Sequence, residues 1–272
     1  MKQETFLNYA NFRWLLITGF LLIAMTIVYA LHRPVGGANG GTVLGYTYGV
    51  VAALAIFYLT WFGIRKRSYY ASKVSLKAHL SAHVWIGIGL LLLVPLHSGF
   101  SFGLNVHTLA YALMALTIVS GIWGAVNYTT MAAEIRSNRG GGSLKLLVEQ
   151  IEELSADIER SLKGASDSLL QFANALDINF TPSVWQAIRS KNYSPIRKAQ
   201  AAELLESLSD SDRKSALKLL SLLDRKIDLA NLVLEETRVM FWLRVWLFVH
   251  VPLSIGCLVT LLIHIVSVFY YW

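Results

Sequence analysis

The chain has 272 residues, of which 55% are hydrophobic and only 15% are charged, and its mean hydropathy is +0.50. A soluble domain usually carries about 25% charged residues, so the composition excludes an ordinary soluble protein and indicates a membrane protein. The net charge of +7 does not indicate nucleic acid as a partner, because the basic excess lies next to apolar segments, where it marks membrane orientation.

Apolar runs without charged residues recur along the chain and are long enough to cross a bilayer. The first covers residues 14–31 and the second 44–64. Residues 78–133 contain no Asp, Glu, Lys or Arg, which leaves room for two spans separated by a turn at 98–105. The last run covers 245–272. We therefore predict an all-α integral membrane bundle of five transmembrane helices.

A hydrophilic segment separates the fourth and fifth spans and is predicted to form a soluble helical insert, because its apolar residues recur at helical spacing. The expected organisation is 1–129 for helices 1–4, 130–239 for the insert and 240–272 for helix 5. Asp210 or Ser211 is expected to cap the last insert helix, which no stop signal separates from the fifth span. The insert is either a rigid scaffold or a docking surface for a soluble partner.

Charge in the loops predicts how the chain lies in the membrane. The loop at 65–77 carries five of the basic residues: Arg65, Lys66, Arg67, Lys73 and Lys77. Positively charged loops stay on the cytoplasmic side, so we expect the N-terminus and the insert there and the C-terminus outside. The expected location is the cell inner (cytoplasmic) membrane, which the chain would cross as a multi-pass protein in contact with lipid.

All seven histidines lie outside the insert, and four of them form two equally spaced pairs. His83 and His97 bracket one apolar stretch, and His250 and His264 bracket another, and the members of each pair are fourteen positions apart. That spacing places both members on one helix face, about 21 Å apart along the axis. Because the third and fifth spans are expected to run in the same direction, His83 would lie level with His250 and His97 with His264.

Two imidazoles at each level are what a b-type haem needs for axial ligation, and ionisable residues inside a membrane are usually functional. Gly89 and Gly256 each lie six residues after the first histidine of their span. A glycine there could let a flat macrocycle approach the backbone, or could simply pack helices together. The pattern predicts two non-covalent b-type haems. Cys257, the only cysteine, excludes covalent attachment through a CxxCH motif.

This histidine pattern resembles the haem-binding four-helix core of di-haem b-type membrane cytochromes. These include the cytochrome b of quinol–cytochrome c complexes and, more loosely, the cytochrome b subunits of hydrogenases and formate dehydrogenases. The resemblance covers the spans but not the insert. It implies axial ligation by His83, His97, His250 and His264 and electron transfer linked to a quinone. A redox subunit, either an iron–sulfur protein or a cytochrome c, would be the partner. The PEWY quinol-site motif of the first class is absent from the sequence.

The remaining polar residues near the predicted haem levels have several possible roles. His107 is a candidate for binding a quinone headgroup, a haem propionate or a proton, or for an interfacial position. His79 is expected to be a propionate or quinone neighbour rather than a ligand, and His32 an interfacial residue. Arg244 could pair with a propionate or anchor the span in the interface.

Two other functions fit part of the pattern. A proton-coupled transporter would need acidic residues within the spans, which have none. A transmembrane ferric reductase or superoxide-forming oxidase core also stacks bis-histidine haems. Such cores normally carry flavin and nucleotide modules, and the motifs of those modules are absent from the insert. The chain is therefore expected to be the electron-transfer subunit of a quinone-linked oxidoreductase rather than a complete enzyme.

Overall fold

The computed structural model describes residues 5–67, 75–138, 144–176, 183–189, 205–206 and 208–270. All regular elements in these ranges are helices, and no strand occurs among them. The chain divides into two compact units. One comprises Met1–Thr129 with Val245–Trp272, and the other comprises Thr130–Arg244.

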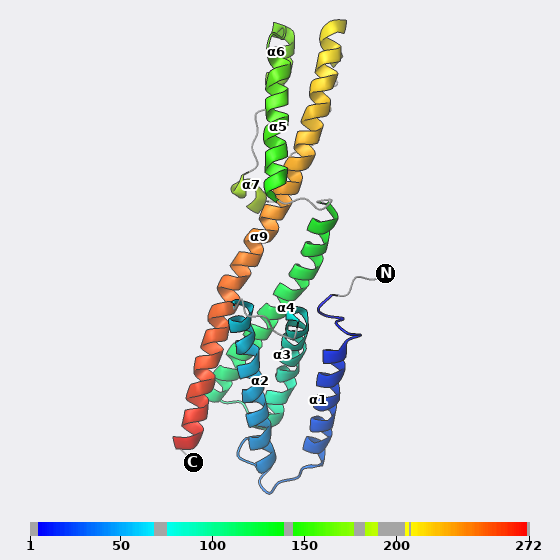
Figure 1. Ribbon diagram of the computed structural model, residues 1–272. Coiled ribbons are helices and arrows are strands. Elements are labelled where there is room, and N and C mark those ends of the chain that lie inside the picture. The colour runs from blue at the N-terminus through cyan, green and yellow to red at the C-terminus, as the bar shows by residue number, and fades with distance from the viewer. Residues whose placement is uncertain are drawn as a thin grey trace. The chain divides into compact units, whose positions relative to one another are not determined.

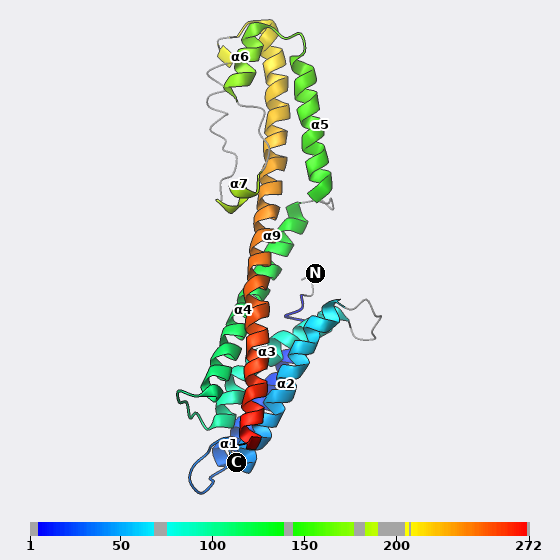
Figure 2. The same cartoon turned by 90° about the vertical axis from the view of Figure 1, so that its left-hand side faces the viewer.

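The first unit is built from long apolar helices, as expected for a helical membrane bundle. It holds α1 (Arg13–Leu31), α2 (Val43–Arg67), α3 (Leu76–Ser98), most of α4 (Val106–Asn138) and the last part of α9 (Asp210–Tyr270). By length and composition, five helices of the described chain could each cross a bilayer. Helix α3 packs against both α1 and α2, as the ribbons in Figures 1 and 2 show.

Polar side chains in this unit bond mostly to backbone carbonyls. The Tyr48 hydroxyl donates to the carbonyl of Met25 at 2.6 Å and so joins α2 to α1. The turn between α3 and α4 begins at Gly99, whose φ is +64°. A Cβ atom there would lie 2.0 Å from the carbonyl oxygen of Ala38, so only glycine fits this close approach.

The second unit is a small helical assembly of α5 (Leu144–Leu162), α6 (Asp167–Ala175), α7 (Val184–Ile188) and the first part of α9. Its buried core takes residues from α5, α6 and α9, and α5 lies beside this part of α9 in Figures 1 and 2. The core residues are Leu147, Ile151, Ile158, Leu169, Phe172, Ala173, Leu176, Ala216, Leu219, Leu223, Ala230 and Val233. Arg238 Nε donates to the Ala187 carbonyl at 2.8 Å and ties α7 to α9.

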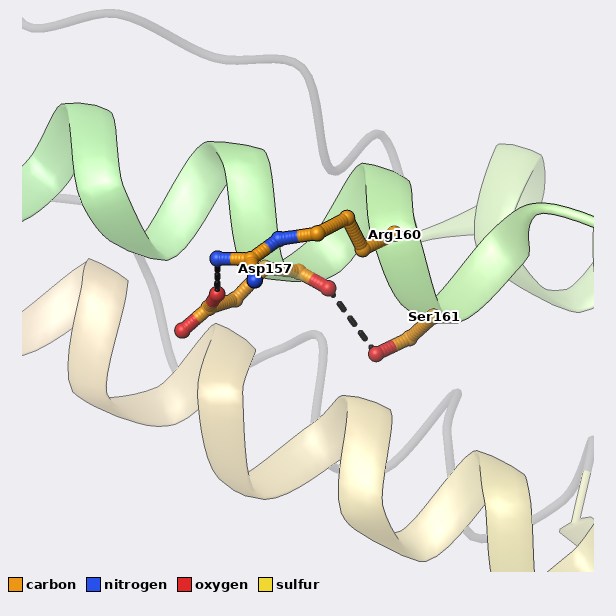
Figure 3. Close-up of polar contacts among 3 residues, drawn as sticks. All are labelled: Asp157, Arg160 and Ser161. Atoms are coloured by element: carbon orange, nitrogen blue, oxygen red, sulfur yellow. Dashed lines mark hydrogen bonds and ion pairs between the residues drawn. The ribbon is translucent and has the colours of Figure 1, made fainter.

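The opposite face of α5 carries exposed charge. The Arg160 guanidinium contacts the Asp157 carboxylate one turn earlier, and the Ser161 hydroxyl donates to the Asp157 carbonyl at 2.9 Å (Figure 3). An exposed pair of this kind contributes at most about 1 kcal/mol. The stability of the second unit therefore comes mainly from the apolar face that α5 turns toward its core.

The start of α9 corrects one expectation. Neither Asp210 nor Ser211 caps the helix, because Ser209 does: its hydroxyl accepts from the amide of Asp212 at 3.3 Å and donates to the Asp212 carboxylate at 3.0 Å. The Ser209 hydroxyl thus bonds to both the backbone and the side chain of Asp212, three positions on, and satisfies one free amide of the first turn. From the sequence, several adjacent Ser and Asp residues could each have filled this role.

Candidate functional site

The histidines that lie close together in the first unit come from α3, α4 and α9, and the closest contacts involve His264. The rings of His97 and His264 have centroids 6.2 Å apart and planes at 79°. The rings of His107 and His264 are closer, with centroids 4.5 Å apart and planes at 88°. The Nδ1 atoms of His107 and His264 form a hydrogen bond. His97 and His264, predicted to lie at one level, are therefore neighbours.

His97 lies in a niche formed by glycines on and before α2. Its Nδ1 is 2.7 Å from the carbonyl oxygen of Gly45, which fixes Nδ1 as the protonated nitrogen. A Cβ atom on Gly49 would lie 2.6 Å from the His97 ring, and one on Gly40 would lie 3.3 Å from it. The absence of side chains at these positions lets the imidazole lie directly on the helix backbone. The ring keeps Nε2 available for a ligand.

His250 is held by α4. Its Nδ1 lies 2.8 Å from the Ser120 hydroxyl oxygen, and that hydroxyl donates to the Thr117 carbonyl at 2.8 Å. Because the one hydroxyl proton is used in this way, Ser120 accepts the proton of His250 Nδ1. A Cβ on Gly121 would lie 3.2 Å from the His250 ring, so this glycine also makes room for the imidazole.

Trp246, one turn before His250, strengthens the same contact with α4. Its indole nitrogen donates to the Ser120 carbonyl at 2.7 Å, and its ring lies against Gly124, where a Cβ would be 2.1 Å away. The Trp246 and His250 ring centroids are 5.3 Å apart. Ser120, Gly121 and Gly124 therefore form a seat on α4 that orients this part of α9.

His83 is the partner expected for His250. The two side chains lie close enough for a charge on one to act on the other. The His83 ring is 5.1 Å from the Phe62 ring, centroid to centroid. Its Nδ1 is buried, and its ring interacts with the backbone of Leu59 on α2. His83 is therefore enclosed on the α2 side, with Phe62 and Leu59 beside its ring.

The glycines predicted to flank a macrocycle have different environments. Gly89 faces α1, because a Cβ there would lie 2.8 Å from Thr18 Cγ2 and 3.2 Å from Leu22 Cδ1. Close helix packing thus accounts for Gly89. Gly256 faces α4 more loosely, and its Cβ would find only Leu113 Cδ1, at 3.8 Å.

The other predicted polar residues are dispersed. The His79 ring stacks on Tyr58 at 6.4 Å, and its Nδ1 is 3.3 Å from the Ser75 carbonyl oxygen. His32 follows α1, and its Nε2 is buried without a hydrogen bond to the described residues. Arg244 is an exposed residue of α9 at the edge of the second unit.

The donor set fits b-type haem. The imidazoles of His97 and His264, with ring centroids 6.2 Å apart, are the residues that would hold a haem iron between α3 and α9. The hydrogen bonds to Nδ1 of His97 and His250 leave Nε2 as the nitrogen for ligation, as metal-bound histidines require. The described residues contain no cluster of three or more His, Cys, Asp or Glu suited to holding a bare metal ion.

Several site residues were not anticipated from the sequence: Gly45, Gly49, Ser120, Gly121 and the contact of His107 with His264. A signal was present, because glycines recur at short helical spacing on the second and fourth spans. It could not be used without knowing which helices are neighbours. Comparison with known proteins adds nothing to this site, since no family model, curated protein or solved structure matches the chain.

Proposed function

We propose that the chain is a di-haem membrane cytochrome b that transfers electrons across the bilayer between the quinone pool and a partner redox protein. One observation carries the proposal: His97 of α3 and His264 of α9 have ring centroids 6.2 Å apart, and His83 and His250 lie fourteen positions earlier on the same two helices. Two pairs of histidines at different levels of the same two helices are suited to hold two haems, one toward each side of the membrane.

The protein's own residues would supply ligation, orientation and burial. Each of the four histidines would supply an imidazole nitrogen, and the contacts to Gly45 and Ser120 hold the rings of His97 and His250 in place. The apolar helices around them exclude water and so influence the redox potential. The bound haems would supply the one-electron chemistry.

The proposal includes an orientation in the cell inner membrane. The basic residues at 65–77 support a cytoplasmic position for that loop, the N-terminus and the insert, with the C-terminus outside. Lys73 of this loop lies outside the described residues, as does the C-terminal Trp272. In this arrangement the insert is a cytoplasmic scaffold or a docking face for the redox partner, which would be an iron–sulfur protein or a cytochrome c.

Haem content is the first test. The chain purified from membranes should hold two non-covalent b haems per polypeptide, extractable with acid acetone and visible in a reduced-minus-oxidised spectrum. The ratio is expected because each haem requires two histidines and the site offers four. A ratio of one, or no haem, would refute the paired arrangement.

Substitution of single ligands tests the pairing. His83→Ala and His250→Ala should each remove the same haem, and His97→Ala and His264→Ala should each remove the other. His79→Ala is the matched control, because His79 lies one turn from His83 but stacks on Tyr58, and it should retain both haems. The pairing is wrong if His83→Ala and His264→Ala remove the same spectral component.

A further inference from the structure

His107 is held firmly at the start of α4. The Asn105 side chain caps this helix, since its Oδ1 accepts from the amide of Thr108 at 3.0 Å, and the Thr108 hydroxyl accepts from the amide of Gly103 at 3.1 Å. His107 therefore lies in a fixed first turn, and its ring meets the ring of His264 at a centroid distance of 4.5 Å.

The contact between the two Nδ1 atoms restricts where the protons lie. Two bare nitrogens would repel each other, and two protonated nitrogens would clash, so one Nδ1 donates and the other accepts. If His264 ligates a metal through Nε2, its proton must be on Nδ1. His107 must then accept at Nδ1 and carry its own proton on Nε2.

We propose that His107 is a positioning residue for His264, which it orients as an Nε2 ligand by accepting the hydrogen bond from Nδ1–H. This inference rests on the proposed function, because it assumes that His264 is an axial ligand. An acceptor that bonds to the Nδ1–H of a ligating histidine fixes the ring and its tautomer and raises the basicity of the ligating nitrogen. A more basic axial ligand stabilises the oxidised iron, so His107 lowers the redox potential of the haem held by His97 and His264.

The two haems would differ in this respect. His250 donates to the hydroxyl of Ser120, and His97 donates to the backbone carbonyl of Gly45. Among the hydrogen bonds of the described histidines, the His107–His264 bond is the one in which imidazole faces imidazole. Replacing His107 should therefore affect one haem and leave the other unchanged.

The test compares His107→Leu, which removes the acceptor, with His107→Asn, whose Oδ1 can accept in nearly the place of Nδ1. Potentiometric titration of the haem absorption bands of the purified full chain should show two steps in the unchanged protein. In His107→Leu one midpoint should shift upward, or that haem should be retained about tenfold less well, while the other stays in place. His107→Asn should restore the shifted step.

A matched control is His32→Leu, because His32 follows α1 and lies outside α3, α4 and α9, the helices that carry His97, His107 and His264. It should leave both midpoints unchanged. Unchanged midpoints and haem content in His107→Leu would overturn the inference but leave the proposed function intact. Equal damage in His107→Leu and His107→Asn would also overturn it, because the residue would then act through shape rather than as an acceptor. Absence of haem from the unchanged chain would refute the proposed function itself.

Discussion

At the scale of single residues, the imidazoles of His97 and His250 are positioned both by a hydrogen-bond acceptor and by a nearby glycine that has no side chain. His97 lies on a stretch of α2 where Gly45 offers a carbonyl oxygen and Gly49 offers an open surface. His250 has a similar arrangement on α4, with Ser120 as the acceptor and Gly121 as the open surface. The surroundings of His97 and His250 share a hydrogen-bond acceptor with a glycine nearby. The acceptor and the glycine can be tested separately.

The open surface can be tested at Gly49. In Gly49→Ala the new methyl would lie 2.6 Å from the His97 ring and would force the ring out of its niche. We expect loss or marked weakening of the haem held by His97 and His264, measured as haem content and as the amplitude of its spectral component. The other haem should remain.

Gly63→Ala is the matched control, because Gly63 lies on the same helix and a Cβ there has nothing within 4 Å. It should retain both haems. Equal loss in the two variants would mean that α2 tolerates no alanine and that the niche has no specific role.

The acceptor can be tested at Ser120. In Ser120→Ala the Nδ1 proton of His250 loses the Ser120 hydroxyl as its acceptor, so the ring is held less firmly with Nε2 facing a ligand. Loss of a second-shell partner typically weakens metal binding about 10–100-fold. We expect that weakening for the haem held by His83 and His250, measured as haem retention during transfer to an apo-globin acceptor.

Thr117→Val is a suitable control on the same helix, because the Thr117 hydroxyl donates to the Leu113 carbonyl of its own helix at 2.8 Å. Its haem retention should match that of the unchanged chain. If Ser120→Ala also matched it, the hydroxyl would not hold His250.

At the scale of helices, Asp212 joins the beginnings of α6 and α9. Its carboxylate accepts from the hydroxyls of Ser168 and Ser209, each at 3.0 Å, while Ser166 caps α6 by accepting from the amide of Leu169 at 3.3 Å. Hydrogen bonds from Ser168, then Ser209 and Ser166, lower the pKa of Asp212 below its usual value. One carboxylate thus stabilises two helix starts.

This linkage predicts a pH dependence. Because the pKa of Asp212 is lower in the folded state, its contribution is complete above the unfolded value of about 3.9 and is lost as the pH falls through the folded value. Asp212→Asn should therefore lower Tm at neutral pH, and the difference from the unchanged chain should shrink as the pH falls below the unfolded value of about 3.9. Circular dichroism during heating measures both.

Asp228→Asn controls for the loss of one negative charge, because Asp228 is an exposed residue of the same helix. It should change Tm little at either pH. The interpretation fails if Asp212→Asn has the same Tm as the unchanged chain at neutral pH, or if its deficit is as large in acid.

Helical periodicity explains why the sequence predicts which residues share a helix face but does not predict the contacts between helices. Fourteen-residue spacing predicts that His97 and His83 share a face of α3, and that prediction needs no knowledge of neighbouring helices. Periodicity does not predict which helix packs against a given face. Gly89 was expected near a haem but packs on α1, and the contact of His107 with His264 depends on where α4 begins. Both are set by tertiary packing, which a single sequence does not encode locally.

At the scale of the whole molecule, the electron path has a direction only if the two haem levels are assigned to sides of the membrane. The assignment depends on the basic loop at 65–77 and on an even number of spans between the N-terminus and the insert. It predicts that Lys163 of the insert faces the cytoplasm. Val35, between α1 and α2, and Leu104, between α3 and α4, should face outward; all three positions are exposed.

Single cysteines can report this orientation. In a Cys257→Ser background, which removes the one native and buried thiol, Lys163→Cys, Val35→Cys and Leu104→Cys each place a thiol in an exposed position. A membrane-impermeant maleimide added to right-side-out spheroplasts should label Val35→Cys and Leu104→Cys but not Lys163→Cys. Inverted vesicles should give the opposite result, and detergent should make all three reactive. Labelling of Lys163→Cys from the outside would reverse the orientation and place His83 and His250 at the outer level, so the insert could not meet a cytoplasmic partner.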